Sequence, residues 1–217
     1  MLVTTNHQYI EVYPIRKSDR RLIIGTIHPH LHNDFQIPFF YGNVGSIWGI
    51  LSKAFPQHDF TSLQSIITTL KEYETSITDI IKTCDREHAN ITRDDLLYNI
   101  VLNKEQIEDG LSESQIDTIY FTSRFSTNSA AKLFVETFRI DYKASFNEST
   151  SEFTIPKSRF GREIRCVVLY SPSGAANVGI SQTRPYLNSI DYYRQFEKPV
   201  ARFKVDFYKE KFNYFDI

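Results

Sequence analysis

Three loops of this 217-residue chain hold most of the side chains that could act on a ligand. The first, Gly25–Asp34, contains His28 and is followed by Asn43, and imidazole, carboxylate and amide groups can each position a water molecule. The second, Thr122–Phe125, offers two hydroxyls that can donate to or accept from the polar edge of a ligand. The third, Ser171–Asn177, has small side chains, so its backbone amides can approach a phosphate closely.

Each loop also has an interpretation that involves no ligand. Hydroxyls that follow a strand can cap the next helix, and a short loop with the composition of the third is typical of a turn. The aromatic run at positions 39–41 can wall a pocket for a planar base, or it can anchor its loop in the core. The first loop has three alternating histidines, but no partner groups that would complete a metal site are recognisable, so we expect no metal.

Composition favours a soluble, globular protein with one domain over residues 1–217. Hydrophobic residues make up 41% of the chain and charged residues 24%, which argues against disorder. The two cysteines, Cys84 and Cys166, have no metal-ligand spacing, and no short motif for a nucleoside triphosphate or an iron–sulfur cluster occurs, so we expect no cofactor. No apolar run approaches the roughly 18–20 residues that span a bilayer, and the N-terminal residues lack a secretory pattern. We therefore expect a cytoplasmic protein that does not contact membranes.

Charge is unevenly distributed although the net charge is only −1. Residues Lys71–Asp117 contain twelve acids and five bases, whereas Lys157–Arg184 contain five bases and one acid. A basic stripe on a neutral protein can bind a polyanion, and it can equally be an ordinary solvated surface. Charge alone thus neither supports nor excludes a nucleic-acid partner.

The hydrophobic pattern alternates short apolar runs with amphipathic segments. Strands are expected at residues 20–26, at 118–122, once or twice within 138–155, and at 164–170, and a short segment of unassigned type lies around 77–81. Helices are expected at residues 46–55, 63–73, 94–102 and 129–138, and a long helix from Pro185 that Pro199 kinks or breaks.

Strands separated by helices indicate parallel pairing through right-handed crossovers, with helices on both faces of the sheet. The fold class is therefore α/β. Ligands of such sheets bind beyond the carboxyl ends of the strands, which is where all three polar loops begin. The sequence thus predicts that the three loops meet at a single cleft.

Several motifs in this order resemble the uracil-DNA glycosylase superfamily, in particular its mismatch-specific and hypoxanthine-type branches. The similarity extends over about residues 20–195. The motifs are Leu22–Thr26, Phe39–Asn43 with Trp48, Ser76–Ile81 with Arg86 and Asp94–Leu96, and Ser171–Gly174.

The resemblance implies a three-layer α/β/α sandwich around a short, mainly parallel sheet. It also implies a protein that flips a deaminated or modified base out of DNA and hydrolyses its N-glycosylic bond without a cofactor. We expect this protein to be a monomer. In that scheme the base is bound by Thr26, Phe39, Phe40, Tyr41, Thr122 and Ser123. The DNA is contacted by Arg162, Ser171, Ser173, Gly174, Asn177 and Arg184.

The sequence departs from the family where the catalytic group is expected. These families place an Asp or Asn just before the Pro of the first motif, but here His28 precedes Pro29. The hypoxanthine-type branch has its catalytic Asn three residues before the Trp, at the position that Gly45 occupies here. The candidates for the water-positioning group are Asn43, then His28, then Asp34. The alternatives are a catalytically inactive relative that binds nucleic acid or a nucleotide, and a small-molecule hydrolase or transferase.

Overall fold

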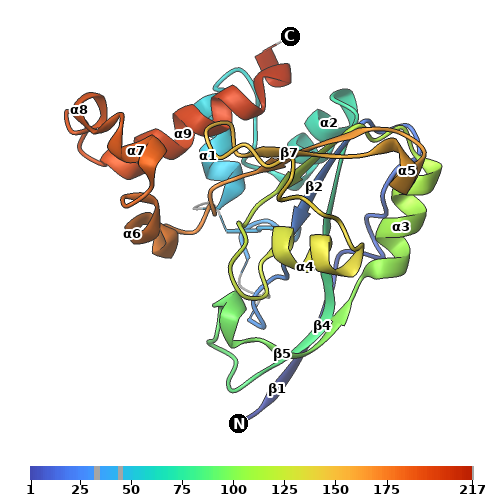
Figure 1. Ribbon diagram of the computed structural model, residues 1–217. Coiled ribbons are helices and arrows are strands. Elements are labelled where there is room, and N and C mark those ends of the chain that lie inside the picture. The colour runs from blue at the N-terminus through green and yellow to red at the C-terminus, as the bar shows by residue number, and fades with distance from the viewer. Residues whose placement is uncertain (32–34, 44–45, 217) are drawn as a thin grey trace.

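The computed structural model describes residues 1–31, 35–43 and 46–216, which form an α/β fold with two sheets (Figure 1). The larger sheet is mixed and has the strand order β3-β2-β6-β8-β7, and the smaller sheet is antiparallel with the order β1-β4-β5. The strands are β1 (Val3–Asn6), β2 (Arg21–Gly25), β3 (Thr75–Asp79), β4 (Ile81–Arg86), β5 (Tyr98–Leu102), β6 (Thr118–Phe121), β7 (Glu152–Ile155) and β8 (Ile164–Val168).

Helices connect most of these strands. They are α1 (Ile47–Ala54), α2 (Leu63–Glu72), α3 (Lys104–Glu113), α4 (Ala130–Thr137), α5 (Lys157–Phe160), α6 (Asn177–Ile180), α7 (Arg184–Leu187), α8 (Ile190–Tyr193) and α9 (Pro199–Lys211). Single 3₁₀ turns lie at Asp94–Leu96, Gly174–Ala176 and Asn213–Asp216. The expected helices at 46–55, 63–73 and 129–138 are confirmed as α1, α2 and α4.

The parallel pairing predicted from the sequence is present in the larger sheet. β2 runs parallel to both β3 and β6, and β6 runs parallel to β8, whereas β7 adds to the edge in the antiparallel sense. Because side chains alternate along a strand, β2 sends Ile23 to one face and Leu22 and Ile24 to the other.

Each face of the larger sheet packs against its own group of helices. On the Ile23 face, Trp48 of α1, Leu70 of α2 and Tyr208 of α9 share one core cluster with the strands. On the opposite face, Ile107 of α3 and Phe134 of α4 belong to a second cluster. The sheet is thus buried on both sides, which explains why its central strands are apolar without alternation.

The prediction of a helix at residues 94–102 is wrong. One 3₁₀ turn is followed by β5, which pairs antiparallel with β4. In β5 the more buried residues Ile100 and Leu102 alternate with the exposed Asn99 and Val101, which is the period of a strand rather than of a helix. The helix of this region, α3, begins only at Lys104 and was not predicted.

The prediction of one long helix that begins at Pro185 is also wrong. Two short helices, α7 and α8, occupy that stretch, and the long helix is α9. Pro199 stands in the first turn of α9, where a missing N–H costs no hydrogen bond, so it starts a helix instead of kinking one.

The predicted basic stripe does not form a free cationic surface. Arg165 pairs with Glu152, and Arg159 pairs with Glu108. Arg162 lies before the amino end of β8, where its Nε donates to Ile116 O at 2.6 Å and its Nη2 to Leu111 O at 2.6 Å. The guanidinium of Arg162 thus joins α3 to the segment before β6 at the amino-terminal edge of the sheet, the edge opposite the one where the three loops begin, so the residue expected to contact DNA does not lie beside these loops.

Arg162→Ala should lower the free energy of unfolding by about 1–3 kcal/mol, because two buried carbonyls lose a charged donor. Urea unfolding measures this change, and Arg184→Ala, which removes an exposed arginine, is the matched control. Equal midpoints for the two variants would contradict the role of Arg162 in joining α3 to the segment before β6.

Candidate functional site

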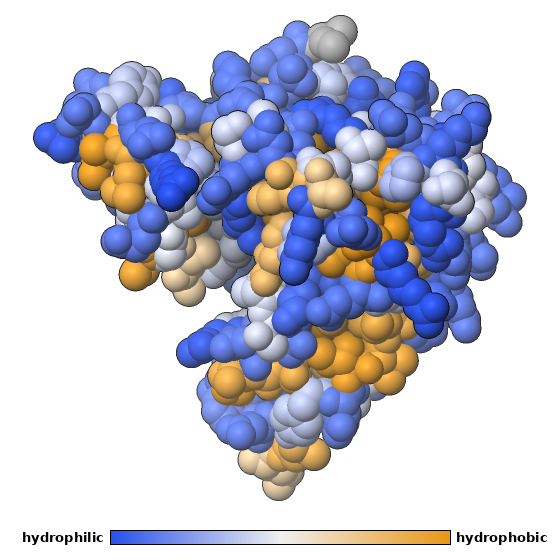
Figure 2. Space-filling view, viewed as in Figure 1, coloured by the Kyte–Doolittle hydropathy of each residue, from blue (hydrophilic) through white to orange (hydrophobic). Residues whose placement is uncertain are grey.

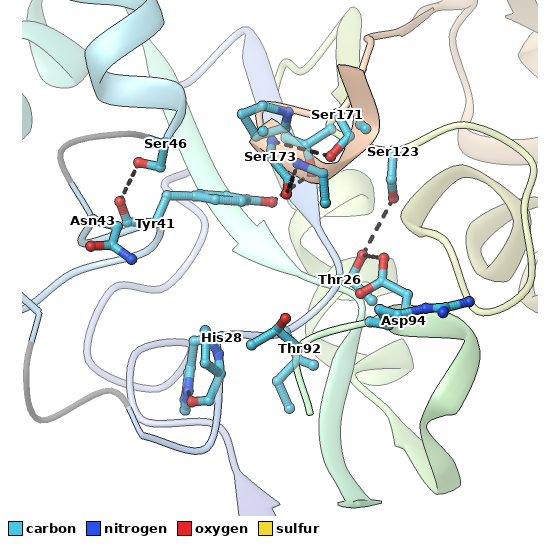
Figure 3. A pocket seen from close by; sticks show the side chains of 18 of the residues that line it. Thr26, His28, Tyr41, Asn43, Ser46, Thr92, Asp94, Ser123, Ser171 and Ser173 are labelled. Atoms are coloured by element: carbon cyan, nitrogen blue, oxygen red, sulfur yellow. Dashed lines mark hydrogen bonds between the residues drawn. The ribbon is translucent and has the colours of Figure 1, made fainter. Parts of the chain in front are cut away.

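The three polar loops meet in one cavity of about 660 Å³ at the carboxyl ends of β2, β3, β6 and β8 (Figure 3). The first loop contributes Thr26–Pro29, the second Thr122 and Ser123, and the third Ser171–Ala176. The turn before β5 closes the lower side with Thr92–Asp94. In the space-filling view the outline is hollowed between the lobe that carries α6–α8 and the lobe around β4 and β5 (Figure 2).

The floor of the cavity lies against Gly25, the last residue of β2. A β-carbon at this position would overlap both Tyr41 Oη and Asp79 Oδ1, so only glycine lets these two oxygens meet the strand so closely. Tyr41 Oη lies 2.6 Å from Thr122 Oγ1. Burial, together with the charge of nearby Asp79, holds the pKa of Tyr41 well above its usual range, so the phenol stays protonated.

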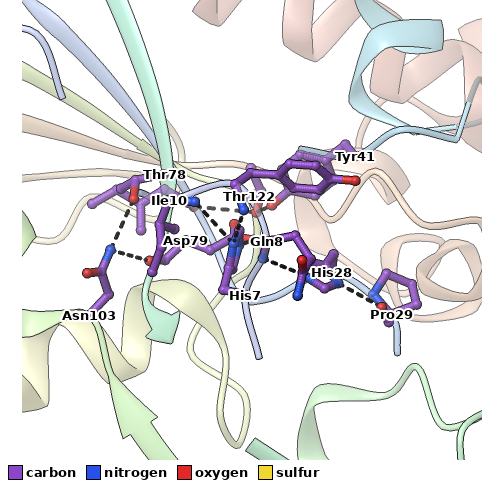
Figure 4. Close-up of polar contacts among 12 residues, drawn as sticks. His7, Gln8, Ile10, His28, Pro29, Tyr41, Thr78, Asp79, Asn103 and Thr122 are labelled. Carbon is purple, nitrogen blue, oxygen red and sulfur yellow. Dashed lines mark hydrogen bonds and ion pairs between the residues drawn. The ribbon is translucent and has the colours of Figure 1, made fainter. Parts of the chain in front are cut away.

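Asp79, the last residue of β3, presents a carboxylate oxygen to this cavity. His7 Nδ1 accepts the backbone N–H groups of Tyr9 and Ile10, at 3.0 and 3.3 Å, so the ring proton is on Nε2. Nε2 donates to Asp79 Oδ2 at 2.7 Å (Figure 4). Asp79 Oδ1 is buried and has no hydrogen-bond partner among the residues that the structure describes. This oxygen is enclosed by the protein, at the point where Tyr41 Oη also approaches Gly25.

A second carboxylate, Asp94, lies on the wall. Thr26 Oγ1 donates to Asp94 Oδ2 at 2.9 Å and lies 3.3 Å from Ser123 Oγ. Asn128 Nδ2 donates to the main-chain carbonyl of Asp94 at 3.0 Å and so fixes the 3₁₀ turn that carries it. Burial raises the pKa of Asp94 to about 6, the hydrogen bond from Thr26 opposes this rise, and the charge of Asp79 adds to it.

Arg86 joins the first loop to the turn that carries Asp94. Its side chain is buried, and it donates to His28 O at 2.9 Å, to Ile91 O at 2.6 Å and to Thr5 Oγ1 at 3.0 Å. One guanidinium thus holds the N-terminal strand and two walls of the cavity in a fixed relation.

His28 lines the cavity, but both of its ring nitrogens bind backbone groups. Nε2 accepts the N–H of Gln8 at 3.1 Å, and Nδ1 lies 2.7 Å from Pro29 O (Figure 4). His28 as a whole residue is 4% exposed. This geometry positions the first loop and leaves neither nitrogen for a water molecule.

Asn43 is an exposed residue on the cavity wall, away from Asp94 (Figure 3). Asp34 lies outside the described residues. Phe39 and Phe40 are buried in the core cluster of α1, so they do not line the cavity, and the aromatic wall is formed by Tyr41 with Phe35.

The third loop brings Ser171, Ser173 and Gly174 to the cavity rim. Asn177 begins α6 and Arg184 is an exposed residue of α7, and neither lines the cavity. The structure therefore brings together Thr26, Tyr41, Thr122 and Ser123 with three of the predicted loop residues. The structure also places two acids at the cavity, Asp79 and Asp94. Both belong to the sequence motifs named above, but the sequence alone assigns them no role.

No protein-family model matches this chain, and no curated protein matches it. Among the described residues, no group of three or more His, Cys, Asp and Glu side chains lies close enough to hold a metal ion. No helix in the described part of the chain is long and apolar enough to cross a membrane.

The raised pKa of Asp94 predicts a pH-dependent difference in stability between the wild type and Asp94→Asn. Folding raises the pKa of Asp94 from 3.8 to about 6, so the native state binds the extra proton between these values. The contribution of Asp94 to stability is therefore complete below about pH 4 and is lost as pH rises through 6. Urea unfolding at pH 7 and pH 5 should show the wild type gaining stability relative to Asp94→Asn at the lower pH.

The matched control is Asp95→Asn, because the exposed neighbour Asp95 pairs with Arg93 and its pKa is lowered by that hydrogen bond. It should show the opposite trend, or none after screening by solvent. A difference between the wild type and Asp94→Asn that does not change with pH would contradict the burial of the Asp94 carboxyl.

Proposed function

We propose that this protein is a DNA glycosylase with the three-layer α/β/α architecture of the uracil-DNA glycosylase superfamily. The observation that carries the proposal is the meeting of three loops, far apart in the sequence, in one cavity with a carboxylate on its wall. Its volume of about 660 Å³ lies within the roughly 300–1,000 Å³ of typical ligand sites. A flipped nucleobase with its deoxyribose fits a space of this size.

Asp94 is the group that best fits the water-positioning role. Thr26 donates to one oxygen of its carboxylate, so the carboxylate is oriented and its other oxygen can hold a water molecule. The negative charge also stabilises the cationic sugar that forms as the C1′–N bond lengthens. The water oxygen then bonds to C1′, the base leaves with the electron pair of the broken bond, and Asp94 takes a proton from the water.

The floor provides the contacts for the base. Tyr41 and Thr122 offer hydroxyls that can donate to or accept from the polar edge of a base. The rings of Tyr41 and Phe35 line the same cavity and can pack against a planar ring. This set of donors and acceptors suits a base that is read along one polar edge.

Binding of nucleic acid or a nucleotide without catalysis is the second candidate. It is favoured by the engagement of both His28 nitrogens and by the exposed position of Asn43, since these were the leading catalytic candidates from the sequence. Under this interpretation the cavity keeps its shape and its loops, and Asp94 only anchors Thr26.

A base-release assay separates the two candidates. Purified protein should release a base from duplexes that carry uracil, hypoxanthine or another modified base, detected as strand cleavage after alkali. Asp94→Asn should slow this release by about 10²–10⁴-fold. The amide of the variant can still accept a hydrogen bond, but it cannot take a proton from water and carries no negative charge. Asp95→Asn, one residue away and exposed, should retain wild-type activity.

Three outcomes are informative. Equal activity of Asp94→Asn and the wild type would remove Asp94 from the mechanism, and Asn43→Ala would then be the next variant. Binding of the duplexes without release of any base would favour the second candidate. Failure to bind any of the duplexes would contradict the glycosylase and would restrict the second candidate to nucleotide binding.

A further inference from the structure

A buried lysine lies directly behind the third loop. Lys204, in α9, is only 4% exposed, and its Nζ donates to three consecutive main-chain carbonyls. The acceptors are Ser171 O at 3.4 Å, Pro172 O at 3.2 Å and Ser173 O at 3.1 Å. Within residues 1–31, 35–43 and 46–216 this ammonium forms no ion pair with a carboxylate. A buried charge without a counter-ion is costly, and here the hydrogen bonds to the three carbonyls offset that cost.

The carbonyl contacts fix the direction of the loop amides. In a trans peptide unit the N–H points opposite to the C=O, and the described chain has no cis peptide bond. Because Pro172 O and Ser173 O turn toward Lys204, the N–H groups of Ser173 and Gly174 turn away from it. Ser171, Ser173 and Gly174 line the cavity on that side. The N–H of Ser173 is taken up by Ser171 Oγ at 3.3 Å, and Ser173 Oγ accepts the N–H of Ala175 at 3.3 Å. The donors that the third loop can offer where it borders the cavity are therefore the N–H of Gly174 and the hydroxyl hydrogens of the two serines.

We propose that Lys204 is a positioning residue that holds the third loop as a binding site for a phosphate group of DNA. The inference rests on the proposed function for the identity of the phosphate as that of a nucleic-acid backbone. The lysine does not touch the ligand. It orients the N–H of Gly174 and the loop serines toward the ligand, and its charge, behind the carbonyls, attracts the anion.

The other elements that pack on α9 leave the charge of Lys204 unbalanced. α6 has no ionisable side chain, Asp191 of α8 pairs with Arg194, and Lys53 of α1 is exposed. Within α9, Asp206 pairs with Arg202, and the hydroxyl of Tyr208 donates to Tyr170 O. Burial lowers the pKa of Lys204 from 10.5 to about 8. The amine is therefore protonated and charged at pH 7, and it loses its proton as pH rises above 8.

Duplex DNA of undamaged sequence, labelled with fluorescein and titrated at constant salt, tests the inference by fluorescence anisotropy. Lys204→Met should weaken binding at pH 7 by about ten- to hundredfold, because the loop loses a charged donor. Lys209→Met, which removes an exposed lysine of the same helix, should bind as the wild type does. Lys204→Arg keeps a charged donor and should recover part of the affinity.

The pH profile excludes a merely structural role. Wild-type affinity should fall between pH 7 and pH 9 as Lys204 loses its proton, whereas Lys204→Met should be weak and nearly independent of pH over the same range. Circular dichroism establishes that the variants are folded. If Lys204→Met does not fold, the pH dependence of wild-type DNA affinity still tests the inference. Constant affinity from pH 7 to 9 would overturn it.

This binding experiment can fail or succeed independently of the base-release assay. Absence of DNA binding by the wild type, or equal affinities of the folded Lys204→Met variant and the wild type, overturns the role of Lys204. Binding with the expected pH profile but without release of any base supports the role of Lys204 and contradicts the glycosylase.

Discussion

The cavity depends on the parallel pairing of β2 with β3 and β6, which brings the ends of these strands to one edge of the sheet. Gly25 and Asp79 are register partners at that edge, and the absence of a β-carbon at Gly25 lets Tyr41 approach from the first loop. Any side chain at this position would separate the hydroxyl of Tyr41 from the floor. The polar groups of the site are thus held by the most rigid part of the fold, and only the rim is made of loops.

The charges around the cavity are arranged with opposite signs on its two sides. Asp79 and Asp94 place carboxylates at the floor and on one wall, while Lys204 places an ammonium behind the third loop. Because Asp94 and Lys204 are largely buried, their charges are less screened than charges in bulk water. A ligand that carries an anionic group at one end and an electron-poor group or N–H donors at the other matches this polarity. A nucleotide in which positive charge develops at the sugar has this distribution.

Much of the framework could be predicted from the sequence because it is encoded locally. The apolar runs that became β2, β6 and β8 are bounded by turn residues, and Ser129 caps α4 through its side chain as its position indicates. Parallel order follows from the alternation of strands with helices, and the meeting of the three loops follows from that order. The errors lie where a short apolar pattern fits both periods, as in β5, or where a proline has two permitted roles, as in Pro199.

The two carboxylates could not be identified in this way, because their burial results from contacts between distant segments. Asp79 is held by His7, which is 72 residues away, and Asp94 is held by Thr26, which is 68 residues away. In the sequence both belong to an acidic stretch that has the composition of a solvated surface. Lys204 is equally unremarkable in a charged helix until the third loop is placed against it. An acid or a lysine becomes a candidate functional group when the fold removes it from water, and only tertiary structure determines which of the many charged residues this affects.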